Sequence, residues 1–485
     1  MASDKINMIK NNLIRIIKNN REVFIFSTVY IIILSIVQIR WHMTLNTNGM
    51  DLGIYDQAIW NCLHGKFFYS TLLDKSLFLD QFRIILLLFV PIYAFFPSVY
   101  VYILSNVIFI GLASIPLYFI CIHKTNSKPI SLIIATAYLL SKYTIASLFS
   151  SHPEAIYPLL FFAIILSILK NNRKLLIITV VISLLVKADT FIYTLFIGAY
   201  LLIIKKDRKS GFIVSTLSLL WGIMVFKIIP IIFLKNSLQQ LTSLPTYSHL
   251  GSNFTEIAWN LITNPLLIIN NVLIPAKLIT LLELFSSVLF LPLLSPGILF
   301  IAAPPILVQI LSNYHWQYRL TTYYSASIIP FIFTGAVFGI SYIKNKYGKK
   351  ISIALILSVI IFLISVFDGR FWKVLKSKYI VVTNHHTYFK EIKNMIPDEA
   401  SVSAQGNLFP HLSHRKVIYD FPVVKDAEYV VLDEKGNKFP LNDEAYKEKV
   451  DEILKSNEYE VIIDYEGYLL IRRISKANLE RSSHL

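Results

Sequence analysis

Asp51-Leu-Gly-Ile-Tyr-Asp56-Gln-Ala-Ile-Trp60-Asn follows the first strongly apolar segment of the chain, residues 22–40. An apolar segment of about 20 residues spans a bilayer as a helix, so this stretch stands just after a membrane exit. Carboxylates are scarce in the sequence, with 30 acidic residues against 46 basic ones among 485. Two aspartates close behind a membrane exit therefore predict a site at the membrane surface.

The composition is that of an integral membrane protein. Hydrophobic residues make up 55% of the chain and charged residues only 16%, whereas soluble domains carry about 25% charged residues. The net charge of +16 comes from lysines and arginines in short runs between apolar segments. That pattern is typical of cytoplasmic loops facing anionic lipid, so we expect membrane lipid and no nucleic acid as partner.

Eleven apolar runs are long enough to cross a membrane as helices, some of them only with their polar flanks. They lie at about 22–40, 98–121, 129–148, 155–169, 173–188, 190–204, 211–233, 276–293, 296–312, 325–343 and 351–367. The sequence therefore predicts a mainly α-helical, polytopic transmembrane domain over residues 22–367.

A twelfth apolar run, residues 84–96, is short and broken by Pro91. If it does not span, the basic loops near residues 170–174 and 205–209 face the cytoplasm, as the positive-inside rule requires; if it spans, they face outward. We therefore expect 84–96 to be a juxtamembrane helix on the outer face. The basic tail, residues 1–21, is then cytoplasmic, and the protein sits in the plasma membrane with its C-terminus outside.

The composition changes near residue 368, where short β-rich runs begin to alternate with helical stretches. We expect residues 368–485 to form a small extracytoplasmic α/β domain. The transmembrane domain should contribute two long outer loops, residues 41–97 and 234–275. Cys62 and Cys121 fall on opposite sides of the membrane in this topology, so no disulfide is expected.

Asp51 and Asp56 are the candidate catalytic residues. On one helix they would lie about 140° apart, whereas Asp56 and Trp60 would share a face. A carboxylate beside an aromatic ring is suited to act as a general base, or to hold a divalent cation such as Mg²⁺ or Mn²⁺, next to a bound sugar or lipid. The alternative is structural, with Asp51 capping an interfacial helix and Trp60 anchoring it.

The predicted topology gathers further polar residues on the outer face, where we expect them to bind substrate. Besides Trp60 they are His152, Glu154, Lys187, Asp189, His315, Arg319, Tyr323, His411, His414 and Arg415. Arginine among aromatic residues is suited to clamp a phosphate, although an aromatic belt gives the same pattern.

Two spacings and one placement bear on the roles of these residues and of the intramembrane charges. Lys187 and Asp189 are two residues apart, and on a helix such residues do not face each other. His411 and His414 could share a helix face and hold a metal, but no third ligand is evident. Lys227 and Glu283 lie within predicted spans, where charged residues are functional candidates or pair with one another.

Several of these segments, taken in order, resemble an uncharacterised family of polytopic membrane proteins, a domain of unknown function grouped with the GT-C glycosyltransferase superfamily. The similarity covers nearly the whole chain. It is carried by Asp51–Asn61 with His64-Gly65, Ser151-His-Pro-Glu154, Val186-Lys-Ala-Asp189, Leu291-Pro-Leu-Leu-Ser-Pro296 and Ser403–Arg415 followed by Tyr419-Asp-Phe-Pro422.

The resemblance implies a GT-C-like bundle with juxtamembrane helices that transfers a sugar from a polyprenyl-phosphate donor to an unknown acceptor on the extracytoplasmic face. Two positions depart from the family pattern, Gln81 in place of a histidine and Ala188 in place of a glutamate. A catalytically inactive lipid-binding scaffold is therefore one alternative. A transporter or flippase of a lipid-linked or small polar substrate is another, because it also uses intramembrane charges.

Overall fold

A computed structural model describes residues 11, 14–80, 82–233, 245–347, 351–367, 370–376 and 380–474. Gln81 and most of the basic tail lie outside these residues. The chain divides into two compact units, and each is described by itself. The first comprises residues 1–35, 82–85 and 105–373, and the second comprises residues 36–81, 86–104 and 374–485.

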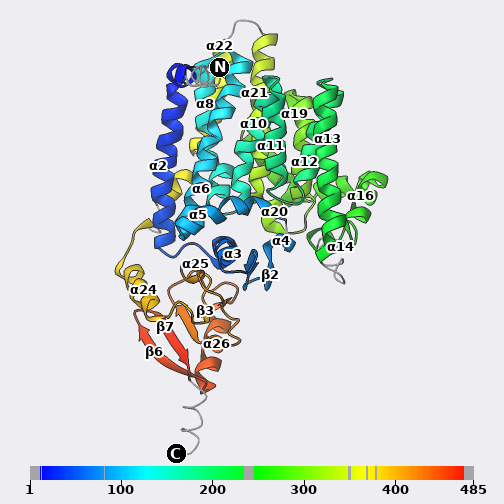
Figure 1. The fold of residues 1–485 in the computed structure, drawn as a ribbon. Coiled ribbons are helices and arrows are strands. Elements are labelled where there is room, and N and C mark those ends of the chain that lie inside the picture. The colour runs from blue at the N-terminus through cyan, green and yellow to red at the C-terminus, as the bar shows by residue number, and fades with distance from the viewer. Residues whose placement is uncertain are drawn as a thin grey trace, which may run out of the picture. The chain divides into compact units, whose positions relative to one another are not determined.

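The first unit is helical (Figure 1). Its longer helices are α7 (Ser114–Thr125), α8 (Lys128–Leu140), α9 (Lys142–Phe149), α10 (Tyr157–Leu169), α11 (Arg173–Leu184), α12 (Thr190–Ile203), α13 (Arg208–Ile223), α16 (Phe254–Thr263), α17 (Pro265–Val272), α18 (Pro275–Ser286), α19 (Pro296–Ile310), α21 (Ile329–Lys346) and α22 (Ile351–Phe367). Two further helices, α2 (Arg21–Met43) and α6 (Val99–Leu112), are shared between the units.

Short helical segments connect these helices. They are η2 (Ile84–Leu88), η3 (Pro153–Ile156), η4 (Met224–Ile228), α14 (Ile229–Phe233), η5 (Pro245–Tyr247), η6 (Leu291–Leu294), α20 (His315–Tyr318), η7 (Tyr323–Ser327) and α23 (Arg370–Leu375). Apolar contacts hold the helices together, as where Val23 packs with Tyr118 and Ala135. Large apolar side chains such as Ile32 and Leu220 remain exposed on the outside of this unit, as expected for helices that face lipid.

A helix lies at each of the eleven predicted spans. In the described part of the chain, four helices are long and apolar enough to cross a membrane, or up to six if each of two bent pairs forms one span. Helices such as α10, with 13 residues, measure about 20 Å, short of a 30 Å hydrocarbon core. The protein is thus mostly helical and of membrane type, and the number eleven stays a prediction.

The second unit contains a five-stranded sheet. Its strands are β3 (Val402–Ala404), β4 (Ile418–Asp420), β5 (Tyr429–Asp433), β6 (Tyr459–Tyr465) and β7 (Tyr468–Arg473), in the order β4-β3-β5-β7-β6. The first three are parallel, and β7 runs antiparallel to both β5 and β6. These strands match β-rich runs of the sequence, whereas the apolar run at 380–382 forms no strand.

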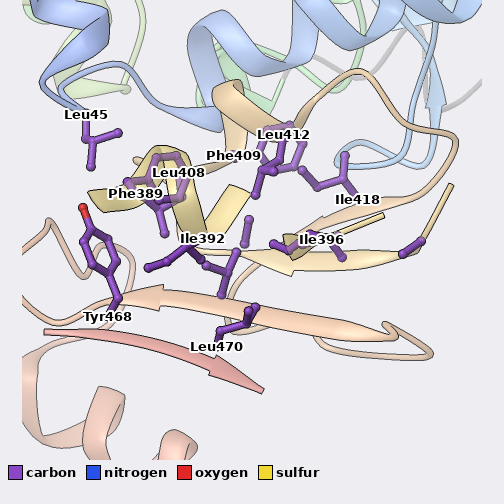
Figure 2. Close-up of a cluster of buried hydrophobic side chains, with 14 residues drawn as sticks. Leu45, Phe389, Ile392, Ile396, Leu408, Phe409, Leu412, Ile418, Tyr468 and Leu470 are labelled. Carbon is purple, nitrogen blue, oxygen red and sulfur yellow. The ribbon is translucent and has the colours of Figure 1, made fainter. Parts of the chain in front are cut away.

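Alternating side chains give this sheet two apolar faces. Val431 of β5 and Leu470 of β7 pack with α24 (Asn384–Met395) and α25 (Phe409–Leu412). Their neighbours Val430 and Leu469 point the other way and pack with α26 (Asp443–Lys455). This is the period of two that a strand buried on both sides requires, and Figure 2 shows the first of the two clusters.

The segment after α2, residues 44–80, completes that first cluster. It contains η1 (Gly49–Gly53), α3 (Ile54–Leu63), the hairpin β1 (Tyr69–Ser70) and β2 (Lys75–Ser76), and α4 (Leu77–Asp80), and α5 (Val90–Phe95) follows later in the same unit. Leu45 is buried in the cluster, as Figure 2 shows. The amide of Gly49 donates to the carbonyl of Gly406 at 2.8 Å. The structure therefore groups this segment with the C-terminal sheet, whereas the sequence placed it in the transmembrane domain.

Gly53 permits a close approach between the segment after α2 and α25. A Cβ at Gly53 would lie 2.5 Å from Cδ1 of Phe409, although its backbone angles, φ −62° and ψ −37°, suit any residue. Gly53→Ala should therefore lower the free energy of unfolding by about 1–3 kcal/mol through overpacking alone. Thermal or denaturant unfolding of the full-length protein in detergent measures the effect.

Gly406→Ala serves as the matched control, because its Cβ would meet only Oδ1 of Asp420, at 3.4 Å. The loss caused by Gly53→Ala should shrink when Phe409 is replaced by leucine. An undiminished loss in that background would contradict the proposed contact.

Candidate functional site

Asp56 lies in the first turn of α3 and its side chain is fully buried. The hydroxyl of Tyr93 donates to Oδ1 at 2.8 Å. The hydroxyl of Ser413 donates to Oδ2, and Nε2 of His414 lies 3.0 Å from the same oxygen. Groups from α3, α5 and the loop after α25 thus converge on one carboxylate.

These neighbours decide the charge of the pair. Burial by itself would raise the pKa of Asp56, but the charge of His414 and the hydrogen bonds from Ser413 and Tyr93 outweigh it, and the pKa lies below its usual value. For His414, burial lowers the pKa, while the Asp56 carboxylate raises it by more. Near neutral pH the carboxylate is therefore ionised, and its charge favours protonation of the imidazole.

His414 is the exposed side of this pair, because its side chain is 29% accessible while that of Asp56 is inaccessible. Trp60 stacks near the His414 ring at 6.0 Å between centroids and on His64 at 3.6 Å. The buried carboxylate of Asp56 therefore lies behind the accessible imidazole of His414 and the indole of Trp60. This agrees with the predicted shared face of Asp56 and Trp60. Aromatic faces of this kind suit the apolar face of a sugar ring or a lipid.

Asp51 lies in η1, where its amide donates to the side chain of Asn48 at 3.0 Å. The side chain that caps this segment is therefore that of Asn48, not that of Asp51. The contacts that hold the Asp56 carboxylate come from Tyr93, Ser413 and His414, so a catalytic pair of Asp51 and Asp56 gains no support.

A divalent cation does not fit at Asp56. Both of its oxygens already face a hydroxyl or an imidazole, whereas Mg²⁺ needs carboxylate oxygens that are free to coordinate it. Among the described residues, no group of three or more His, Cys, Asp or Glu side chains could hold a metal ion. The cation expected at Asp51 and Asp56 therefore has no part in the proposed reaction.

Arg415 holds the loop that carries Ser413 and His414. Its guanidinium donates to the carbonyls of Leu412 and Ala400 at 2.7 and 2.9 Å, and the residue is 3% exposed. Burial lowers the pKa of this guanidinium to about 10. The structure thus gives Arg415 a positioning role in place of the predicted contact with substrate.

His411 is half-buried. Its ring stacks on that of His42 at 3.9 Å between centroids, and burial lowers its pKa well below the usual value. His411 and His414 therefore face different neighbours, and the metal pair considered from their spacing does not form.

A second cluster of charged residues lies in the first unit. The guanidinium of Arg83 contacts Glu154 at 3.1 Å, and Nζ of Lys187 lies 3.8 Å from Glu154 and 3.7 Å from Asp189. Nδ1 of His152 lies 3.6 Å from Glu154. Two carboxylates and two permanent cations compensate one another here, as buried charges require.

Two details correct the sequence interpretation of this cluster. Lys187 and Asp189 do contact each other, because α11 ends at Leu184 and α12 begins at Thr190, so the helical rule does not apply to them. The space beside them is about 10 Å³, and Tyr323, which stacks on His152 at 3.4 Å, lines it. That is room for about one water molecule, not for a substrate.

The remaining predicted residues lie elsewhere in the first unit. Arg319 and His315 are exposed beside α20, and Arg319 lines a separate cavity. Glu283 pairs with Lys142 at 3.1 Å. Of the two alternatives for Lys227 and Glu283, a mutual ion pair is not supported, because Glu283 pairs with Lys142.

The sequence interpretation missed Tyr93, Ser413 and Arg83. The sequence did offer a signal for Arg83. It stands at the start of the apolar run 84–96, where its charge can pair with an acid on the same side of the membrane. Ser413 lies between two residues that were singled out. Nothing in the sequence marks Tyr93 from the other tyrosines, because its role depends on the packing of α5 against α3.

The fold is that of a mostly helical membrane protein. The crystal structure of ArnT from Cupriavidus metallidurans bound to undecaprenyl phosphate matches 93% of this chain and 98% of its own, with a TM-score of 0.50 and 10% identity. At that identity the match shows the fold alone.

The chain belongs to the family described as predicted membrane protein, DUF2079, whose model matches residues 41–470. A comparison of the sequence with curated proteins finds no match. The family and the fold thus agree with the resemblance noted in the sequence.

The charge pair predicts a defined pH dependence of stability. Because the pKa of His414 is raised in the fold, the stabilisation it gives is complete below about pH 6.5 and is lost as the pH rises through the folded-state pKa. The difference in unfolding midpoint between the protein and His414→Gln should therefore be largest near pH 6 and shrink toward pH 9. A difference that grows with pH would show that His414 is not paired with an ionised Asp56.

Proposed function

We propose that this membrane protein transfers a sugar from a polyprenyl-phosphate donor to an acceptor at the extracytoplasmic face. The observation that carries the proposal is the likeness, over nearly the full chain, to ArnT, a structure bound to undecaprenyl phosphate. One fold hosts several functions, so the site must add support. The Asp56–His414 pair beside Trp60 supplies it, because it combines a proton-transfer group with an aromatic surface.

The chain segments that make up the second unit support the proposed topology. Thr71 donates to the carbonyl of Ile418, and Gln57 donates to that of Arg415, so the first outer loop and the C-terminal region lie on one side of the membrane. An even number of spans must then separate them. The ten predicted spans between residues 98 and 367 satisfy this condition, and a spanning 84–96 would violate it.

The parity requires an odd total of spans, such as the predicted eleven, with the two termini on opposite sides of the membrane. Which side is the cytoplasm follows from the basic loops, as the positive-inside rule requires. The proposed arrangement thus has Asp56, Trp60 and His414 on the extracytoplasmic side of the plasma membrane.

In the proposed reaction the neutral form of His414 is the general base, and Asp56 acts through it. The acceptor hydroxyl loses its proton to the imidazole nitrogen that does not face Asp56. Its oxygen bonds to the anomeric carbon of the sugar, and the bond from that carbon to the phosphate oxygen breaks. The polyprenyl phosphate leaves with the electron pair, while Asp56 stabilises the imidazolium.

Loss of the acid should abolish transfer. Full-length protein in proteoliposomes is given undecaprenyl-phosphate monosaccharides labelled on the sugar, with a cell-envelope extract as acceptor source. We expect Asp56→Asn and His414→Gln to lower transfer by about a hundredfold or more, the usual contribution of a general base. Release of undecaprenyl phosphate and transfer of the label are measured together.

Glu399→Gln is the matched control, since it removes one carboxylate that is 83% exposed in the same unit. It should keep full activity. Full transfer by Asp56→Asn at normal expression would sink the assignment, and loss in Asp51→Asn alone would move the role to Asp51.

A transporter or flippase is the second candidate. The buried cluster of Arg83, Glu154, Lys187 and Asp189 favours it, since buried charges at the ends of membrane helices can line a transport path. This candidate predicts movement of labelled undecaprenyl-phosphate sugar across proteoliposomes without any transfer, and loss of that movement in Glu154→Gln. Binding with neither transfer nor movement would instead favour the inactive scaffold that Gln81 and Ala188 suggested.

A further inference from the structure

Lys142, Arg319 and Lys373 line one cavity of about 250 Å³ in the first unit. Lys142 is the first residue of α9, Arg319 follows α20, and Lys373 lies in α23. Glu283 of α18 is the one carboxylate in the lining, which otherwise consists of Tyr143, Leu320 and Thr321. Three cations thus face one acid.

The acid is already engaged. Its oxygen lies 3.1 Å from Nζ of Lys142, which also lies 5.2 Å above the ring of Tyr143. Within the part of the chain that the structure describes, Arg319 and Lys373 have no carboxylate within ion-pair distance. The cavity therefore carries two uncompensated positive charges.

The backbone adds to this charge. The helix pair α8 and α9 is bent by 45° at a break before Lys142, so the N-terminus of α9 opens at the cavity lining. A helix N-terminus carries a partial positive charge that favours anions. Broken membrane helices commonly direct such ends at anionic groups of their ligands.

We infer that this cavity binds the phosphate headgroup of a membrane lipid. Arg319 supplies the planar fork that matches phosphate oxygens, and Lys373 supplies a point charge. The volume suits a headgroup and not a whole lipid, whose tail would remain outside. Basic pockets between membrane helices bind lipid headgroups in this way. The choice of a lipid phosphate as occupant rests on the proposed function.

Lipid retention in native mass spectrometry tests the inference. The full-length protein in phosphatidylcholine nanodiscs is titrated with undecaprenyl phosphate, and separately with phosphatidylglycerol. Arg319→Gln combined with Lys373→Gln should weaken binding by about tenfold or more, since two charge-assisted contacts are lost. Lys205→Gln combined with Lys206→Gln, which removes two exposed charges elsewhere, should change nothing.

Each outcome either supports or overturns the inference. Selective loss of undecaprenyl phosphate in the Arg319/Lys373 variant supports a donor-type lipid, and equal loss of phosphatidylglycerol supports a general site for anionic headgroups. Unchanged binding of both lipids, or an equal loss in the control, overturns the inference. Asp56→Asn should still bind the lipids. A negative result in the transfer assay would therefore not count against the binding result.

Discussion

The buried carboxylate of Asp56 is the interaction on which the second unit depends. An ionised acid with no solvent contact is costly unless every oxygen is satisfied. Here Tyr93, Ser413 and His414 satisfy it. These partners come from segments more than 300 residues apart in the sequence, so the charge can be buried only when the first outer loop packs against the C-terminal sheet.

This requirement links the local chemistry to the membrane topology. Two loops that share a core must emerge on the same side of the bilayer, which constrains how often the chain crosses between them. The close approach of Gly53 to Phe409 and the burial of Leu45 in the sheet cluster give the same contact an apolar basis. Packing and charge therefore favour one arrangement.

Much of the fold followed from sequence patterns because it depends on local periodicity. Short β-rich runs after residue 368 predicted the strands of the sheet, and the i, i+4 spacing of Asp56 and Trp60 predicted a shared face. The site could be predicted only in part. The contact of Lys187 with Asp189 depends on where a helix ends, and the role of Arg415 depends on carbonyls that only the folded loop presents.

A double-mutant cycle between Asp56→Asn and His414→Gln tests the central claim most directly. The free energy of unfolding is measured for the protein, both single variants and the double variant near pH 6.5. Residues that share a buried charge pair should show a coupling of about 0.5–3 kcal/mol. A coupling near zero, with each single variant folded, would contradict the view that this pair holds the outer loop and the C-terminal sheet together.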